Sequence, residues 1–198
     1  MDRPDTDEVL VRRYQQGSAA AFEQLVERHS ARVFHLCLRI LGDPDDAADA
    51  SQDAFLTAVR KLDTFRGEAA FTTWLHRVTV NACYDALRRK RRQPMLRLVG
   101  PDDEDRVEPG PPAPDHADRV ELSVDVERAL RAVPDDFRIA LLLADVEDLP
   151  YDRIAEILGV AVGTVKSRVF RGRAALGRAL GVAEGEPAHP SRASEEEA

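Results

Sequence analysis

The stretch YDRIAEILGVAVGTVKSRVFRGRAALGR, residues 151–178, decides the fold of the C-terminal part of this chain. Residues 151–158 have the spacing of a short helix, Gly159 marks a turn, and a second helix with several cations and no acid follows. A short helix, a glycine turn and a basic helix are the pattern of a helix-turn-helix, so DNA is the first partner to consider. The polar and basic residues expected on the DNA-facing side are Thr164, Lys166, Ser167, Arg168, Arg171 and Arg173.

Hydrophobic periodicity predicts helices, and no strand, throughout the N-terminal part. Apolar residues recur at three- and four-residue spacing, which is the spacing of one helix face. Ser18 and Asp43 are N-cap candidates, and Gly42 is a C-cap candidate. The helices predicted in this way cover residues 18–42, 43–62 and 71–92.

A stretch rich in proline and acids separates this part from the helix-turn-helix. Its composition predicts a flexible linker of extended character. Each flanking block is near the lower size limit for an independent core. We therefore expect an all-α fold of two small helical domains joined by a flexible linker, the second containing the helix-turn-helix. The expected boundaries are 1–93 for the first domain, 94–119 for the linker, 120–182 for the second domain and 183–198 for a disordered acidic tail.

The composition is typical of a globular protein, with 43% apolar and 32% charged residues and a net charge of −8 at pH 7. No apolar run approaches the ~20 residues of a membrane-spanning helix, and the N-terminus lacks the features of a signal peptide, so we expect a cytoplasmic protein. The cations are concentrated at 88–97 and 166–178. Because the net charge opposes these local attractions, we expect weak binding to duplex DNA unless a larger partner docks the chain there.

The helix over 71–92 combines aromatic and cationic side chains. Its five consecutive cations, residues 88–92, indicate either a charged C-terminal turn favoured by the helix dipole or a phosphate-contacting surface. Five exceed what a dipole requires, which favours phosphate. Trp74 belongs either to the core or to a stacking surface for single-stranded bases, worth roughly 1–3 kcal/mol per base. The polar face of this helix carries Arg77, Asn81, Asp85 and Arg88.

The helix over 43–62 carries an acidic stripe. Like charges at this spacing cost a helix a few tenths of a kcal/mol each, although acids near a helix N-terminus are favourable. The stripe is either a solvated face or a docking face for a basic protein partner. Its members are Asp45, Asp46, Asp49, Gln52 and Asp53.

Catalytic and metal-binding motifs are missing from the sequence. There is no glycine-rich phosphate loop with lysine, no Ser/His/Asp pattern and no HExxH motif. The histidines lack ligand spacing, and Cys37 and Cys83 are expected to be buried, reduced thiols. We expect no enzyme activity, no metal and no cofactor.

Three segments, in this order and spacing, resemble the extracytoplasmic-function (ECF) sigma factors of bacterial RNA polymerase. They are DDAADASQDAFLTAVRKLDTFRG (45–67), FTTWLHRVTVNACYDALRRKRR (71–92) and DDFRIALLLADVEDLPYDRIAEILGVAVGTVKSRVFRGRAAL (135–176). The resemblance runs from about Leu10 to Leu180. It implies a subunit that binds core polymerase and directs transcription initiation at a specific, stress- or signal-responsive set of promoters.

The resemblance also implies roles for the residues above. The acidic stripe would dock on a coiled coil of the polymerase β′ subunit, the helix over 162–178 would read the −35 element as duplex, and the linker would thread through polymerase channels formed by β and β′. An anti-sigma factor is an expected partner. The single-stranded −10 element would be held by Arg66, Gly67, Glu68, Phe71, Trp74, Arg77, Asn81, Arg88 and Arg89.

Two positions depart from the family pattern. Ala161 stands where relatives often have an N-capping serine, a loss of roughly 1 kcal/mol, and Pro150 replaces the usual cap before Tyr151. Two other functions compete with the implied one. A conventional helix-turn-helix regulator would need no aromatic and basic helix, and an adaptor that binds only proteins would not need the acid-free stretch 159–178.

Overall fold

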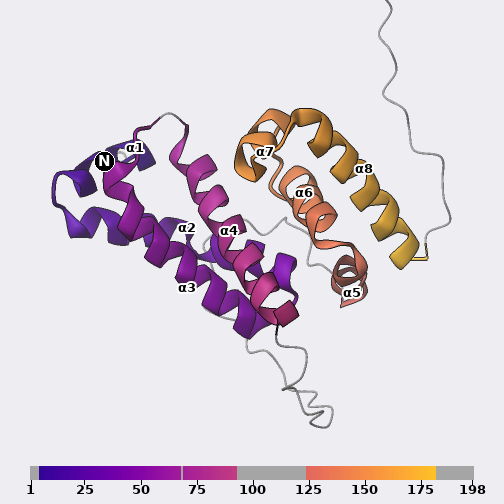
Figure 1. Cartoon of the computed structure of the whole chain (residues 1–198). Helices are drawn as coiled ribbons and strands as arrows, with labels where there is room; N and C mark the ends of the chain where they lie inside the picture. The colour runs from indigo at the N-terminus through magenta and orange to yellow at the C-terminus, as the bar shows by residue number, and fades with distance from the viewer. Residues whose placement is uncertain (1–4, 68, 93–123, 182–198) are drawn as a thin grey trace, which may run out of the picture.

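The computed structural model describes residues 5–67, 69–92 and 124–181, and within these ranges every regular element is a helix (Figure 1). The all-α expectation is confirmed. Glu68, the linker and the acidic tail lie outside the described residues. The first domain contains α1 (Asp7–Gln15), α2 (Ala19–Leu41), α3 (Pro44–Lys61), the 3-10 turn η1 (Leu62–Thr64) and α4 (Phe71–Arg92). The second contains α5 (Val124–Ala132), α6 (Asp135–Asp145), α7 (Tyr151–Leu158) and α8 (Val162–Ala179).

The junction between α2 and α3 follows the sequence signals. Gly42 ends α2 in the left-handed region, at φ 70°. The Asp43 carboxylate then accepts the backbone N–H groups of Asp45 and Asp46, at 3.1 and 3.0 Å. At the other end of α2, Ser18 occupies the N-cap position, but its side chain makes no capping hydrogen bond. None of the described helices has both the length and the hydrophobicity needed to cross a bilayer.

Helix α1 was not predicted from periodicity. The Tyr14 hydroxyl donates to the Val59 carbonyl at 3.1 Å, and Gln15 Nε2 donates to the carbonyls of Leu62 and Phe65 at 3.0 and 2.9 Å. These long-range bonds tie α1 to the end of α3 and to the loop that leads into α4. The sequence gives no signal for them because their acceptors are backbone atoms.

The predicted helix-turn-helix is present as α7 and α8. Gly159 ends α7 at φ 65°, a backbone conformation that glycine adopts without steric cost. Ala161 precedes α8 and makes no side-chain cap, as its chemistry requires. The shared core holds Ile154, Ile157, Val165 and Val169 fully buried, with Leu158 and Val160 half-buried at its edge.

Helix α8 crosses α6 closely at Gly172. A Cβ added there would lie 2.9 Å from the Phe137 carbonyl oxygen and 3.2 Å from Leu141 Cβ. A backbone atom cannot rotate away as a flexible side chain can. Gly172 therefore sets the distance between the two helices.

Alanine substitution should accordingly have opposite effects at two glycines of α8. We expect Gly172→Ala to lower the free energy of unfolding by about 1–2 kcal/mol, since overpacking outweighs the gain in helix propensity. Gly177→Ala, where nothing lies within 4 Å of the added Cβ, should instead stabilise by about 0.5–1 kcal/mol. Urea unfolding measures both, and equal stabilisation by the two changes would contradict the packing argument.

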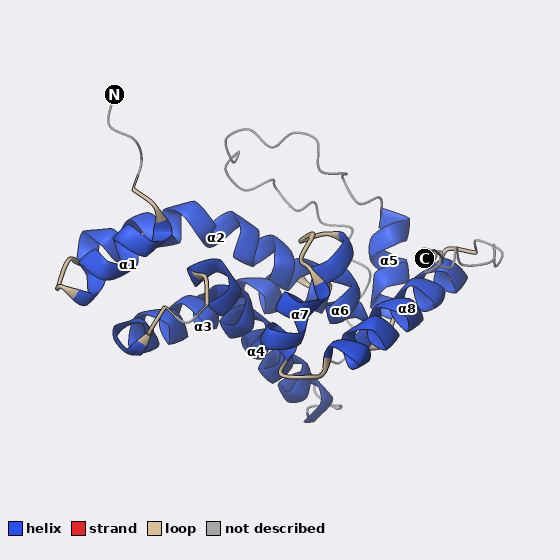
Figure 2. Ribbon diagram, turned by 90° about the horizontal axis from the view of Figure 1, so that it is seen from above, coloured by secondary structure: helices blue, strands red, loops and turns tan. Residues whose placement is uncertain are grey.

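The two domains lie against each other rather than apart. Helix α7 packs on α4, while α5 and α6 contact α2 (Figures 1 and 2). Buried apolar residues of both domains form one continuous core cluster. The two expected helical domains are present, and they share this core because apolar residues on α2 and α4 are covered by the second domain.

Candidate nucleic-acid interface

A cavity of about 460 Å³ opens at the loop before α4, where the sequence places single-strand recognition. Arg66, Gly67 and Phe71, three of the residues that the resemblance implies for the −10 element, line it. Arg12 and Gln15 of α1 also line it and were missed, because α1 itself was not predicted. Arg153 of α7 reaches the same cavity from the second domain.

Three aromatic rings pack together beside this cavity. The Trp74 ring centroid lies 5.3 Å from that of Phe65 and 5.8 Å from that of Phe71. Phe71 is only 2% exposed, so its ring is a core element that cannot stack freely on a base. Trp74 is half-buried, which leaves one part in the cluster and another part accessible. Core packing and base stacking, the two interpretations of Trp74 from the sequence, are thus compatible.

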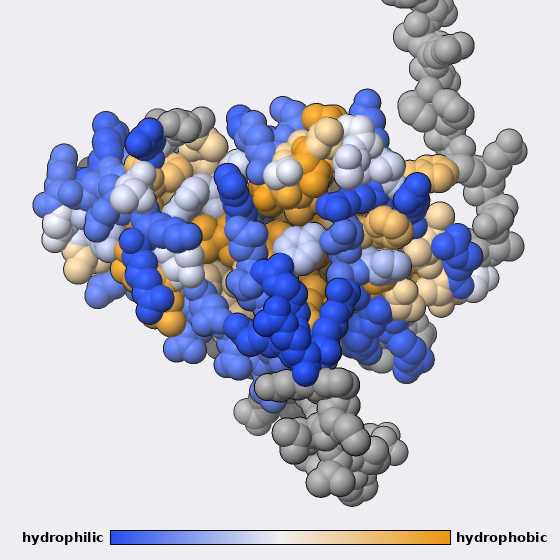
Figure 3. All heavy atoms as spheres, viewed as in Figure 1, coloured by the Kyte–Doolittle hydropathy of each residue, from blue (hydrophilic) through white to orange (hydrophobic). Residues whose placement is uncertain are grey.

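The outer face of α4 is cationic, but most of its terminal cations have carboxylate partners. Arg77 and Asn81 are exposed. Arg88 pairs with Asp85, Arg89 pairs with Asp53 at 3.3 Å and Lys90 pairs with Asp46 at 2.7 Å. Because exposed ion pairs are worth only about 0–1 kcal/mol, incoming phosphates can displace them. Figure 3 shows hydrophilic side chains gathered over the C-terminal end of α4.

The structure divides the acidic stripe of α3 into two sets. Asp45, Asp49 and Gln52 are exposed. Asp46 and Asp53 are half-buried and turned toward the cations of α4. The stripe is therefore not a single face, because five positions over nine residues spread around the helix axis.

Leu56 continues the exposed set and was missed by the sequence argument. It is 44% exposed and follows Gln52 by one helical turn. Its position in that register is the signal that could have found it. An exposed leucine beside carboxylates is typical of a protein interface with a polar rim.

Helix α8 presents its cations unevenly. Lys166, Ser167 and Arg171 are exposed, whereas Thr164 and Arg168 are half-buried. Thr164 and Arg168 are therefore less accessible to a DNA partner than the other three. Four contacts hold polar side chains of α8 in place. Ser167 Oγ donates to the Thr164 carbonyl at 2.9 Å, and the Arg171 guanidinium lies 5.8 Å from the centroid of the Phe137 ring. Arg168 Nη2 donates to Asp136 at 2.9 Å, and Arg173 Nη2 donates to Asp145 at 2.6 Å.

Phe170 is a candidate contact that the sequence argument missed. It lies on the outer side of α8 with 58% of its surface exposed. Its position one turn after Lys166 was the available signal. A single exposed apolar residue is ordinary on a protein surface, so Phe170 is a candidate because of its place beside the exposed Lys166 and Arg171 of α8.

Asp136 connects the two helices that carry candidate DNA contacts. One of its oxygens accepts the Tyr84 hydroxyl of α4 at 3.0 Å, and the other accepts Arg168 Nη2 of α8 at 2.9 Å. Burial, reinforced by the Asp136 charge and hydrogen bond, raises the pKa of Tyr84 to about 12. The tyrosine therefore stays protonated and remains a hydrogen-bond donor.

Glu147 is the most deeply buried charge between the domains. It follows α6 and is 4% exposed. Its Oε2 accepts Arg32 Nε of α2 at 2.6 Å and His76 Nε2 of α4 at 3.3 Å. Burial alone would raise the pKa of Glu147, but the hydrogen bonds and charges of His76 and Arg32 outweigh it and set the pKa at about 2. The side chain is therefore a carboxylate at neutral pH.

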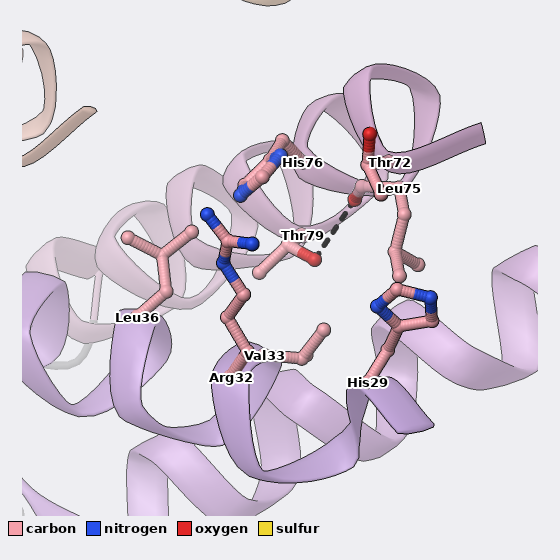
Figure 4. A pocket seen from close by; sticks show the side chains of 8 residues that line it. All are labelled: His29, Arg32, Val33, Leu36, Thr72, Leu75, His76 and Thr79. Carbon is pink, nitrogen blue, oxygen red and sulfur yellow. Dashed lines mark hydrogen bonds between the residues drawn. The ribbon is translucent and has the colours of Figure 1, made fainter. Parts of the chain in front are cut away.

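Figure 4 shows the first-domain side of this contact. Arg32 rises from α2 toward His76 on α4, above a hollow of about 10 Å³ that Leu36 and Thr79 also line. The sequence contains no signal for the site because its three members, on α2, on α4 and just after α6, are far apart in the chain.

The described residues contain no cluster of side chains that could hold a metal ion. The prediction of two buried, unbonded thiols is confirmed, because Cys37 and Cys83 are both fully buried and free, with their Sγ atoms 3.6 Å apart. The hydrogen bond with Cys37, together with burial, raises the pKa of the Cys83 thiol, so Cys83 lacks the thiolate character of a reactive site.

Comparison with known proteins matches both domains. Residues 25–93 match sigma-70 region 2, and residues 123–176 match sigma-70 region 4. The ECF RNA polymerase sigma factor SigM of Mycobacterium tuberculosis is 40% identical over 176 residues, which cover 89% of this chain and 85% of SigM. The RNA polymerase sigma-H factor of Pseudomonas aeruginosa is 37% identical over 182 residues, covering 89% and 94%.

A solved structure is similar over most of the chain. The sigma factor RpoE of Bartonella quintana, crystallised with the anti-sigma factor NepR, superposes with a TM-score of 0.64 at 27% identity, covering 82% of this chain and 98% of RpoE. Two promoter-binding sigma regions on one all-α chain define a transcription regulator rather than an enzyme. The chain belongs to the extracytoplasmic-function sigma factors of bacterial RNA polymerase.

Proposed function

We propose that this chain binds core RNA polymerase, recognises −10 and −35 promoter elements and directs initiation at a specific set of genes that respond to stress or another signal. One observation carries the proposal: the chain has two different DNA-binding faces. The first domain has a cavity beside a cationic helix, and the second has a helix-turn-helix with exposed cations. A regulator of duplex DNA would need only the second.

The second domain is proposed to place α8 in the major groove of the −35 element. Exposed Lys166 and Arg171 supply donors for base edges and phosphates, and Phe170 supplies an apolar contact of the kind that thymine methyl groups accept. Arg168 can join them only after leaving Asp136. The proposed contacts are Thr164, Lys166, Ser167, Arg168, Arg171 and Arg173, with Phe170 in addition.

The first domain is proposed to hold the −10 element as a single strand. The cavity beside Arg66 is within the size range of small-ligand sites, which supports capture of one unstacked base. The exposed part of Trp74 supports stacking by a neighbouring base. The proposed contacts are Arg66, Gly67, Glu68, Phe71, Trp74, Arg77, Asn81, Arg88 and Arg89, with Phe71 acting through the cavity wall.

Core polymerase is proposed to dock on the exposed set of α3. Asp45, Asp49 and Gln52, with Leu56 beside them, combine charge and an apolar contact. Asp46 and Asp53 support this face indirectly, through their ion pairs with α4. The 94–119 linker is proposed to join the domains through channels formed by β and β′.

Regulation by an anti-sigma factor is proposed as well. It is supported by the similar sigma factor RpoE, whose structure contains the anti-sigma factor NepR. Because core polymerase works in the cytoplasm, the chain is proposed to act there.

Run-off transcription with purified core polymerase tests the function. We expect the chain to produce new, discrete start sites on a promoter library, with −10 and −35 elements that recur among the transcribed templates. Core polymerase alone provides the control. A chain that shifts duplex DNA without core and yields no new start sites would be a conventional regulator, and one that does neither would be an adaptor.

A further inference from the structure

The second domain partly covers the candidate single-strand face of the first, at the cavity beside Arg66, while Arg77 and Asn81 stay exposed. Helix α7 lies on α4, and Arg153 of α7 lines the same cavity as Arg66 and Gly67 (Figures 1 and 2). Any strand entering that cavity along α4 must share the space with α7. The helix that limits access to this cavity, α7, is therefore part of the same chain.

The closed arrangement also keeps the two DNA-reading helices too close together. Tyr84 of α4 and Arg168 of α8 are separated by the single carboxylate of Asp136. The resemblance to the family implies −10 and −35 elements about one and a half turns of DNA apart, which is on the order of 50–60 Å at ~3.4 Å per base step. The closed chain cannot occupy both elements, so opening must precede promoter recognition.

Glu147 provides the most buried polar contact of this arrangement. The carboxylate comes from the second domain, and both of its partners, Arg32 and His76, come from the first. In the ion pair with Arg32, only the carboxylate is buried, since the Arg32 side chain is 41% exposed. Removal of Arg32 therefore leaves a buried charge unpaired and is strongly destabilising, whereas removal of the carboxylate costs the charge-assisted hydrogen bonds. Such a contact fixes one orientation of the second domain on the first. Both of its hydrogen bonds are lost together when the domains separate.

Two further pairs reinforce the same orientation. Arg91 of α4 pairs with Asp135 at 2.5 Å, and Arg131 of α5 donates to the Gly42 carbonyl at 3.3 Å. Both cross the domain boundary and both are solvent-exposed. They are therefore weak individually, as is the exposed Tyr84–Asp136 hydrogen bond, whereas the contact of Glu147 with His76 is buried.

We propose that the second domain is an intramolecular inhibitor of the first, and that Glu147, held by Arg32 and His76, is the latch that keeps the chain closed. The partner that releases the latch is core polymerase, which must separate the domains to span a promoter. The regulatory meaning of the latch rests on the proposed function; its existence as a domain lock does not.

Distance measurement between the domains tests the latch directly. Cysteines replacing the exposed Gln24 of α2 and Ala174 of α8 carry a fluorescent donor and acceptor in the full chain, while the native thiols are buried. We expect Glu147→Gln to raise the ratio of open to closed molecules at least roughly tenfold. Asp148→Asn is the matched control, because it removes one charge at the next, exposed residue, whose φ of 51° suits asparagine. It should leave the distance distribution unchanged.

Exchanging the two charges distinguishes loss of the ion pair from misfolding of the variant. Arg32→Glu should open the chain, and Arg32→Glu combined with Glu147→Arg should close it again. An unchanged distance distribution in both Glu147→Gln and Arg32→Glu would overturn the proposal. Opening without recovery in the exchanged pair would also overturn it, since the pairing itself would then not be the restraint.

A second measurement connects the latch to DNA. Without polymerase, Glu147→Gln should bind a single-stranded −10 oligonucleotide roughly tenfold more tightly than the parent chain, because the cavity is uncovered. Opening with unchanged binding would refute the inhibitory role while leaving the lock intact. Failure of the parent chain to support run-off transcription would instead refute the proposed function, so the two failures are distinguishable.

Discussion

Reversing the charges of Asp45 and Asp49 together should abolish co-purification of the chain with core RNA polymerase. Both carboxylates are exposed on α3, one turn apart, beside Gln52 and Leu56. Lysines at these positions would meet the basic surface that the carboxylates are proposed to contact, and like charges across an interface cost several kcal/mol. We expect the affinity for core to fall roughly 100-fold or more.

The matched control reverses Glu23 and Glu27 on α2. These residues are also exposed and also one turn apart, and the change in net charge is the same. Normal core binding by this control with loss in the α3 variant would locate the interface. Equal loss in both would mean that net charge decides binding, and equal retention would remove α3 from the interface. Asp53 is unsuitable for this test because its reversal also disturbs its ion pair with Arg89.

Acid should weaken the contact between the domains through Glu147. The folded pKa of about 2 lies below the ordinary value of 4.5, so the unfolded chain binds the proton first as the pH falls. The stabilisation is therefore complete above about pH 5 and is lost as the pH falls through 4.5 toward 2. At about 1.4 kcal/mol per pKa unit, it amounts to at most about 3 kcal/mol, of which roughly 2 kcal/mol is lost by pH 3.

Urea unfolding of the full chain and of Glu147→Gln at pH 6 and pH 3 measures this effect. The difference in unfolding free energy between the two proteins should shrink by about 2 kcal/mol at the lower pH. Asp148→Asn, compared in the same way, should show no such dependence because Asp148 is exposed. A constant difference between parent and Glu147→Gln would mean that the carboxylate is not paired in the folded chain.

The helices themselves were predictable from local chemistry. The apolar spacing of α2, α3 and α4, the Gly42–Asp43 junction and the Gly159 turn each act within a few residues of sequence. Helix α1 escaped prediction because it has nine residues and is held by distant carbonyl groups.

The sequence indicates which helices carry the candidate site residues. It does not indicate which of those side chains are exposed and which are already paired. The sequence placed polar and charged residues on α3, α4 and α8, yet gave no means of separating Asp45 and Asp49 from Asp46, whose partner Lys90 lies on another helix. Arg168 was expected on the DNA-facing side, and the sequence contains no sign of its ion pair with Asp136. Exposed Phe170 was missed because an aromatic residue in an apolar pattern is ordinarily core.

The sequence by itself determined two helical blocks, the helix-turn-helix and the family, because these depend on periodicity and on motifs in fixed order. Tertiary structure alone decided which charges are engaged and how the blocks face each other. Glu147, Arg32 and His76 lie on three separate elements, and nothing in their local sequence marks them as partners. Electrostatic pairing depends on distances between helices, which only the packed chain sets.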